Sequence, residues 1–205
     1  MADLKPGARG VPYDQRLGAL LVQTLARTPI APNHLTGLSF ALGALAGWTL
    51  AQGRFGLGAG LFMLAVFIDH LDGELARATR RTSRFGHYLD YAVGAANYTM
   101  MYLGAGIGLA AGELGSAALT LGLAAALSNP AVLAVRLANE TRHGSEAVAH
   151  PYFHGFEIED FIYLIGPFAW LGWFDVFFLA YALGALGYLA WQTWELVRRV
   201  RATAP

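Results

Sequence analysis

The chain has 205 residues, of which 56% are hydrophobic and only 14% are charged, with no cysteine and a formal net charge of zero. Because a soluble domain carries about 25% charged residues, this composition excludes an ordinary water-soluble enzyme and a disordered chain. The lack of cysteine excludes disulfides, thiolate metal sites and cysteine nucleophiles, and the zero net charge gives no support to nucleic-acid binding.

The N-terminal segment predicts a helix on the membrane surface rather than a secretory signal. Charged residues such as Lys5, Arg9 and Arg16 interrupt the apolar core that such a signal requires. Over about residues 13–27, apolar side chains recur at helical spacing while charges lie on another side. This pattern is typical of an amphipathic helix in the membrane interface.

Uncharged runs predict six membrane spans after this helix. The expected fold class is therefore an all-α integral membrane protein, with one membrane domain over residues 1–205. A span needs about 20 residues, and because the uncharged runs 55–68 and 161–174 are shorter, their helices are expected to continue through acidic residues. The predicted spans are about 35–52, 55–78, 86–111, 114–138, 157–174 and 175–197.

The basic residues predict that both termini face the cytoplasm. With six spans, 13 of the 14 Lys and Arg residues fall on one side, and only Arg54 falls on the other. Such an excess marks the cytoplasmic loops of membrane proteins. The Ala- and Arg-leaning composition leads us to expect a bacterial inner membrane.

The acidic segment at the end of the second predicted span is the candidate functional site, because ionisable side chains at membrane depth are costly. Asp69 and Asp72 are three residues apart on one helix face, and Asp90 begins the next span at the same cytoplasmic end. Carboxylates that repel one another favour a hard divalent cation between them. A salt-bridge network with the neighbouring arginines is the alternative.

The spacing of these acids resembles a known signature, that of the CDP-alcohol phosphotransferases (CDP-alcohol phosphatidyltransferases), membrane enzymes of phospholipid synthesis. The similar run is Asp69-x2-Asp72-Gly73-x2-Ala76-Arg77-x8-Gly86-x3-Asp90. The segment Pro32-Asn33-His34-Leu35-Thr36 is also similar to the one that opens the first span in that family. Six spans behind a surface helix is the family architecture.

The resemblance implies a transferase that moves a substituted phosphate from a CDP-linked donor, such as CDP-diacylglycerol, to an alcohol acceptor with release of CMP. It implies Mg²⁺ or Mn²⁺ held by Asp69, Asp72 and Asp90 in a cavity open to the cytoplasm. It also implies a homodimer in the lipid bilayer, which the Gly/Ala faces of spans three and four would support. The residues implied to bind the CDP-linked donor are Asn33, Thr36, Asp69, Gly73, Ala76, Arg77 and Gly86.

Arginines near the cytoplasmic ends of the spans are the candidates for acceptor binding. Arg80 and Arg84 lie between the second and third spans, and Arg136 and Arg142 lie at the end of the fourth. They would suit a phosphorylated acceptor, and the alternative is the ordinary basic bias of cytoplasmic loops.

One position departs from the family signature, which ends in another Asp four residues after Asp90. This chain has Gly94 there, and glycine can neither hold a metal nor take the proton of an acceptor hydroxyl. His87, on the face of Asp90, is the candidate replacement base and would act beside Asp90 in catalysis. The other candidate bases are Glu74, Glu157, Glu159 and Asp160. Base-free chemistry, an inactive homologue that binds nucleotide or lipid, and a small transporter also stay open.

Overall fold

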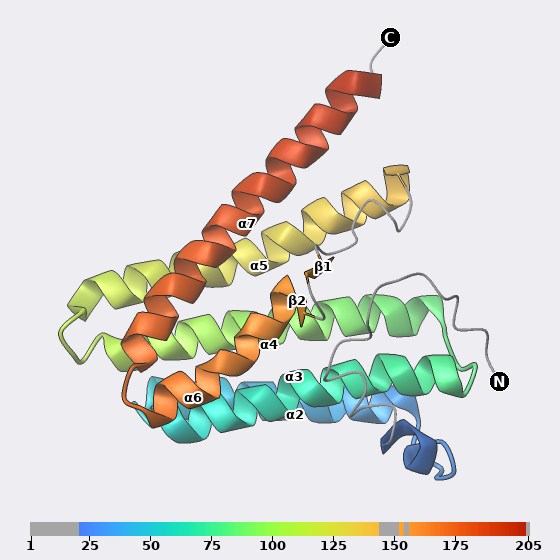
Figure 1. Ribbon diagram of the computed structural model, residues 1–205, viewed down its shortest axis with the longest axis horizontal. Coiled ribbons are helices and arrows are strands. Elements are labelled where there is room, and N and C mark those ends of the chain that lie inside the picture. Colours follow the sequence, from blue (N-terminus) through green and yellow to red (C-terminus); the bar gives the residue numbers. More distant parts are fainter. Residues whose placement is uncertain (1–20, 144–151, 154–155, 204–205) are drawn as a thin grey trace.

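The computed structural model describes residues 21–143, 152–153 and 156–203, which are almost entirely helical (Figure 1). The helices are α2 (Pro32–Ala51), α3 (Phe55–Ala78), α4 (Arg84–Leu109), α5 (Gly115–His143), α6 (Ile165–Trp170) and α7 (Phe174–Thr203). A 3-10 helix, η2 (Ile158–Leu164), precedes α6. Strands β1 (Tyr152–Phe153) and β2 (Phe156–Glu157) pair as a short antiparallel hairpin.

Local chemistry explains where these helices begin and turn. Pro32 opens α2, where its missing N–H is not needed. Ser83 caps α4 by accepting a hydrogen bond from the backbone N–H of Gly86 at 2.9 Å. Gly53, with φ of 72°, turns the chain between α2 and α3. These signals place α2, α3 and α4 as consecutive antiparallel helices.

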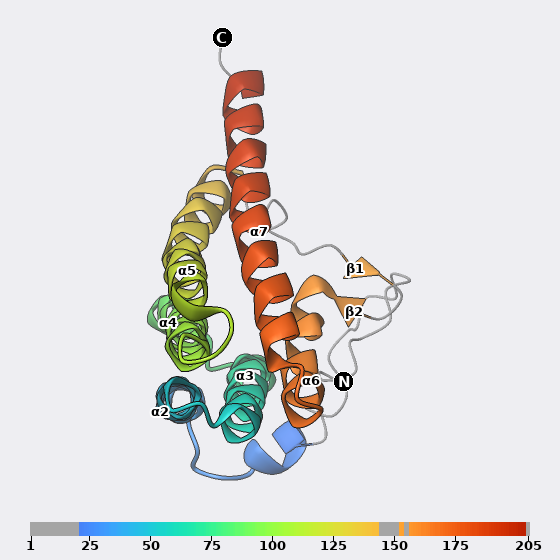
Figure 2. The ribbon, with the colours of Figure 1, turned by 90° about the vertical axis from the view of Figure 1, so that its left-hand side faces the viewer.

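Close packing joins α2, α3, α4 and α5. Figure 2 shows α2 and α3 side by side, with α4 and α5 stacked above them. A Cβ at Gly104 would lie 2.1 Å from the Gly47 carbonyl oxygen, and a Cβ at Gly122 would lie 2.7 Å from that of Tyr102. Small residues let helices approach closely in lipid. These glycines therefore serve packing inside the chain.

The membrane character of the helices follows from their length and composition. Three segments, Phe55–Ala78, Gly115–Arg142 and Phe174–Arg201, are long and apolar enough to cross a membrane. Helix α3 covers the same residues as the second expected span, and α4, α5 and α7 overlap the third, fourth and sixth. The count of six spans stays a prediction.

The segment expected to form the fifth span, 157–174, is not one continuous helix. It consists of η2, the short α6 and a turn at Gly172, where φ is 81°. Pro167 gives a physical reason, because a proline has no N–H and its ring clashes with the preceding helical turn. Here Pro167 lies in the first turn of α6, where both problems are avoided. The preceding residues take the 3-10 form instead.

Only the end of the expected surface helix lies within the described residues. Residues 21–25 are helical, and residues 1–20 lie outside the described part. Val22 is buried against Leu35 of α2 and Leu71 and Leu75 of α3. Val22 is therefore packed against the ends of α2 and α3 at which Thr36 and Asp72 lie.

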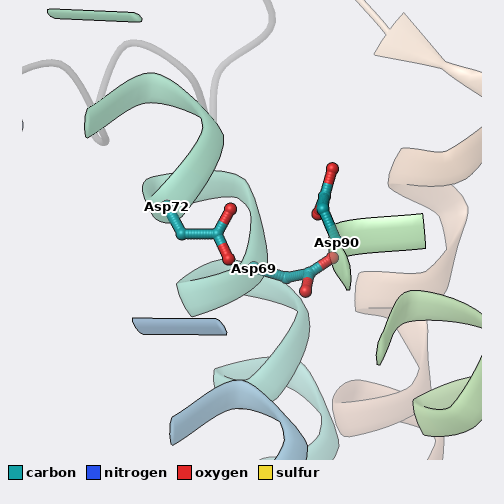
Figure 3. Close-up of side chains that lie close together, drawn as sticks. All are labelled: Asp69, Asp72 and Asp90. Atoms are coloured by element: carbon teal, nitrogen blue, oxygen red, sulfur yellow. The ribbon is translucent and has the colours of Figure 1, made fainter. Parts of the chain in front are cut away.

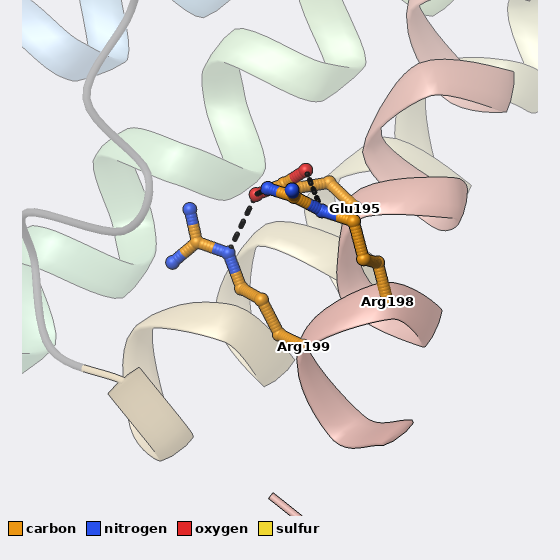
Figure 4. Close-up of polar contacts among 3 residues, drawn as sticks. All are labelled: Glu195, Arg198 and Arg199. Atoms are coloured by element: carbon orange, nitrogen blue, oxygen red, sulfur yellow. Dashed lines mark hydrogen bonds and ion pairs between the residues drawn. The ribbon is translucent and has the colours of Figure 1, made fainter. Parts of the chain in front are cut away.

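Helix α7 crosses α5, and its C-terminal part extends beyond the other helices (Figure 1). The Tyr102 hydroxyl of α4 donates to the Tyr181 carbonyl of α7 at 3.2 Å. Near the end of α7, Arg198 and Arg199 donate to Glu195 at 2.8 Å (Figure 4). Pairs one helical turn apart support a helix, and these lie on the part of α7 that extends furthest.

The Gly47–Gly104 contact predicts a large effect of one methyl group. Gly104→Ala would place a Cβ 2.1 Å from a backbone oxygen, so we expect it to lower the free energy of unfolding by about 1–3 kcal/mol. The measurement is unfolding of the purified protein in detergent. Gly37→Ala is the matched control, because a Cβ there meets nothing within 4 Å. Equal stability of both variants would contradict the close approach of α2 and α4.

Candidate functional site

Three carboxylates from two helices meet between α3 and α4. Asp69 and Asp72 come from α3 and Asp90 from α4, and one oxygen of each lies within 4.8 Å of the others. Figure 3 shows their side chains directed into the space between the two helices. Asp72 is only 4% exposed, while Asp69 and Asp90 are half-buried. The expected juxtaposition of the three acids is present.

Helix α2 supplies hydroxyl groups to the two aspartates of α3. The Thr36 hydroxyl donates to Asp72 Oδ2, and the Ser39 hydroxyl lies 3.3 Å from Asp69 Oδ1. Because α2 and α3 are antiparallel, a step of three residues along α2 matches the step of three between the acids. Thr36, which was expected to bind the donor, is thus buried against Asp72.

The donor set suits a divalent cation. Three hard oxygen ligands of negative charge are what Mg²⁺ and Mn²⁺ prefer. Without a cation, three carboxylates this close would repel one another in surroundings of low polarity. The hydroxyls of α2 hold two of the acids in place without neutralising them. The three acids therefore could hold a divalent cation.

Asp69 and Asp90 line a cavity of about 840 Å³, and Asp72 is not among the described residues that line it. Charged and polar residues line it near these two acids, together with Gly73: His70, Glu74, Arg77, Tyr91 and Arg136. Apolar residues of α5, η2, α6 and α7 line much of the remainder, together with polar residues such as Asn97 and Asn129: Val132, Leu133, Phe161, Leu164, Phe168, Val176 and Phe177. One space therefore combines a charged region with a long apolar wall, as a ligand with a phosphate head and an apolar tail requires.

Most residues of the acidic segment lie at this cavity. Gly73 and Arg77 line it, and Arg77 donates to Glu74 at 2.8 Å. Gly94 also lines it, and a Cβ there would lie 3.7 Å from Asp69 Oδ2. A side chain at position 94 would therefore face the acids, and the glycine leaves that space open.

Other residues expected to bind the donor lie elsewhere. Of the described residues, those lining the cavity do not include Asn33, Thr36, Ala76 or Gly86. Asn33 and Gly86 are nevertheless neighbours, because a Cβ at Gly86 would lie 3.6 Å from Asn33 Oδ1. The starts of α2 and α4, which carry the two family segments, thus come together beside the acidic cluster.

The four arginines expected to bind the acceptor separate in the structure. Arg136 lines the cavity, and its guanidinium carbon lies 6.0 Å from the centre of the Tyr91 ring. Among the described residues that form the cavity wall, Arg80, Arg84 and Arg142 do not appear. Arg80 belongs to the turn between α3 and α4 and has a φ of 54°. Only Arg136 of this group is placed to touch a ligand in the cavity.

The candidate replacement bases also differ in position. The His87 side chain is 43% exposed, and its Nε2 lies 3.5 Å from Glu140 Oε1 of α5. Its ring lies 4.5 Å from that of Tyr91, so His87 stands behind a residue of the cavity wall. Glu74 lines the cavity itself. The side chains of Glu157, Glu159 and Asp160 lie outside the described part of the structure.

Sequence reasoning missed His70. This residue lines the cavity next to Asp69, and its Nδ1 lies 3.5 Å from the Tyr163 hydroxyl of η2. The available signal was its position inside the acidic segment, one residue after Asp69. Nothing in the spacing indicated that this side of α3 faces the cavity as well.

A family model and curated relatives match the sequence. The family model described as CDP-alcohol phosphatidyltransferase matches residues 29–197. The chain is 37% identical over 123 residues to a bifunctional IPC transferase and DIPP synthase of Rubrobacter xylanophilus, covering 60% of this chain and 26% of that protein. It is 38% identical over 71 residues to the archaetidylinositol phosphate synthase of Pyrococcus horikoshii, covering 35% of this chain and 38% of that protein.

A solved structure shares the fold. The phosphatidylinositol phosphate synthase of Mycobacterium tuberculosis, with CDP-DAG bound, superposes with a TM-score of 0.68 and 17% sequence identity. The match covers 88% of this chain and 94% of that chain. The match to the two curated relatives, in contrast, spans well under half of their own length.

The cluster predicts that single acids are needed for ligand binding but not for folding. Asp69→Asn and Asp72→Asn should each abolish Mn²⁺-dependent binding of a cytidine nucleotide, measured by titration calorimetry. Their melting temperatures should be unchanged or higher, because mutual repulsion is relieved. Asp175→Asn, at an exposed acid of α7, is the control and should bind like the parent. Parent-like binding by both cluster variants would contradict the metal-site assignment.

Proposed function

Because the chain belongs to the CDP-alcohol phosphatidyltransferase family, we propose that it transfers a substituted phosphate from a CDP-linked donor to an alcohol acceptor. The observation that carries the proposal is the cluster of Asp69, Asp72 and Asp90, two of which, Asp69 and Asp90, line a large cavity. In the reaction, the acceptor oxygen forms a bond to the β-phosphorus of the donor. The bond from that phosphorus to the bridging oxygen breaks, and CMP leaves with this oxygen.

The three acids would hold Mg²⁺ or Mn²⁺. When bound, the ion would polarise the phosphate oxygens and offset the charge that develops on the leaving CMP. Arg77, held by its contact with Glu74, would add positive charge beside the pyrophosphate. Gly73, Ala76 and Gly86 would leave room for the cytidine, with Asn33 and Thr36 nearby.

We propose a lipid-linked donor of the CDP-diacylglycerol type. The long apolar wall from α5 to α7 supports this choice, since acyl chains require such a surface. The mycobacterial protein of the same fold has CDP-DAG bound. Its relevance to this chain is an inference from the shared fold and from the apolar wall.

We propose a phosphorylated alcohol as the acceptor. Arg136 lines the cavity near the acids, and a guanidinium group pairs well with a phosphate. Arg80, Arg84 and Arg142 would attract such an acceptor from a distance through their charge. The names of two similar proteins, archaetidylinositol phosphate synthase and phosphatidylinositol phosphate synthase, favour an inositol phosphate.

The proton of the acceptor hydroxyl needs a replacement acceptor, because Gly94 lacks a carboxylate. We propose His87, whose ring is oriented by Glu140 and lies behind Tyr91. A carboxylate beside an imidazole fixes the orientation of the ring. Glu74 is the alternative within the cavity, and an inactive homologue that binds nucleotide is the competing function that Gly94 favours.

The proposed setting is the bacterial inner membrane, with the active site open to the cytoplasm. The basic residues at the ends of the spans support this orientation. A homodimer is part of the proposal, although the glycines of α4 are engaged within the chain. The donor and acceptor would then enter from the cytoplasmic side.

The central experiment measures CMP. Purified protein in nanodiscs is incubated with CDP-diacylglycerol, Mg²⁺ and a panel of alcohols that includes inositol phosphate and glycerol phosphate. We expect CMP release with a phosphorylated acceptor, loss of release on chelation with EDTA, and at least a hundredfold lower rate for Asp90→Asn, on the scale of electrostatic stabilisation lost at an active site. Nucleotide binding without CMP release for every acceptor would contradict the proposal and favour the inactive homologue.

The variant Gly94→Asp distinguishes a protein that uses a replacement base from one that has lost its base. The new carboxylate would face Asp69 one helical turn from Asp90. If His87 is the working base, the added charge crowds the site and CMP release should fall, and His87→Ala should be severe as well. If the base has simply been lost, Gly94→Asp should raise CMP release. His87→Ala with parent-like rates would exclude His87, and Glu74→Gln then tests the alternative.

A further inference from the structure

A chain of buried polar side chains stands behind Asp69. Ser39 of α2 is fully buried, and its Oγ lies 3.3 Å from Asp69 Oδ1 and 2.9 Å from the Ala65 carbonyl oxygen. Asn97 of α4 is 1% exposed and donates from Nδ2 to Ser39 Oγ at 2.9 Å. Three helices thus contribute to one polar contact directly behind the acid.

The hydrogen-bond donors and acceptors around Ser39 orient its hydroxyl. A hydroxyl has one hydrogen to donate. Because Asn97 donates to Ser39 Oγ, that hydrogen is directed to the other two neighbours, Asp69 and the Ala65 carbonyl. An ionised carboxylate is the stronger acceptor of the two. The reversed amide of Asn97 would leave the hydroxyl with three acceptors and no donor, so the observed orientation satisfies it best.

The side-chain amide of Asn97 is closely packed, but one of its polar atoms has no hydrogen-bond partner. Its Oδ1 is buried and has no hydrogen-bond partner, and a Cβ at Gly43 would lie only 2.0 Å from it. A buried polar atom without a partner is costly. Asn97 carries this cost while its Nδ2 serves Ser39, and Gly43 is the residue that leaves room for the amide.

We propose that Ser39 and Asn97 are positioning residues that hold the Asp69 carboxylate in the orientation in which it binds a divalent cation. The inference rests on the proposed role of the acidic cluster as a metal site. Residues that orient a metal ligand from behind contribute about 10- to 100-fold to metal affinity. Ser39 would act on the metal only through Asp69, and Asn97, which also lines the cavity, would act through its hydrogen bond to Ser39.

The test measures binding of Mn²⁺ alone, by electron paramagnetic resonance and by calorimetry, on the whole purified protein in nanodiscs. We expect Ser39→Ala to weaken Mn²⁺ binding about tenfold, at the lower end of that range, and Asn97→Ala to weaken it in the same direction. Thr49→Ala is the control, because Thr49 is equally buried on α2 and donates only to carbonyls of its own helix. Unchanged Mn²⁺ affinity in Ser39→Ala, or an equal loss in Thr49→Ala, would overturn the inference.

A double-mutant cycle tests whether the two residues act in one chain. Ser39→Ala combined with Asn97→Ala should bind Mn²⁺ no more weakly than Ser39→Ala alone, because both act through the same contact. Additive losses of Mn²⁺ affinity would contradict the inference that Asn97 acts through Ser39. If Ser39→Ala fails to fold, Asn97→Ala alone decides, and parent-like affinity in it overturns the inference.

The outcome is separable from that of the proposed reaction. A parent protein that binds Mn²⁺ but releases no CMP would overturn the transferase proposal, while a loss of Mn²⁺ affinity in Ser39→Ala would still support the positioning role. A parent that binds no Mn²⁺ would overturn the positioning inference, because no metal would be left for Asp69 to hold.

Discussion

Repulsion among three partly buried carboxylates is the constraint on which the rest of this structure depends. Asp69, Asp72 and Asp90 bring negative charge to membrane depth, where charged groups are poorly solvated. Hydroxyls from α2 orient two of them without neutralising them. A cation bound by the three acids would offset their repulsion. The cavity lined by Asp69 and Asp90 would then offer a charged region for phosphate and an apolar wall for a lipid.

The close approach of α2, α3 and α4 makes this arrangement possible. A serine or threonine hydroxyl is short, so it reaches a neighbouring helix only where the backbones lie near each other. The glycine contacts between α2 and α4 bring the helices to that distance, with Gly47 against Gly104 and Gly43 against Asn97. In lipid, where apolar burial adds little, such shape complementarity largely decides which helix faces meet.

The sequence revealed what charge and spacing could reveal, namely the acids, the family and most of the helices. It did not reveal Ser39 or Asn97, because neutral polar residues do not interrupt an uncharged run. Four arginines looked equivalent along the chain, but only Arg136 lines the cavity among the described residues. The break in the fifth expected span followed from Pro167, whose effect on a helix depends on whether it lies in the first turn.

The turn between α2 and α3 has three residues, Gln52, Gly53 and Arg54, and it lies about 20 Å from the acids, at 1.5 Å for each helical residue. Its length nevertheless fixes which residue of α2 faces which residue of α3. Each residue of a helix turns it by about 100°, so a change of length that the loop does not absorb would rotate α3 relative to α2, and Thr36 and Ser39 would then no longer face Asp72 and Asp69. The chemistry at one end of the bundle is therefore tied to the length of a loop at the other, and that loop is expected to tolerate changes of residue type far better than changes of length.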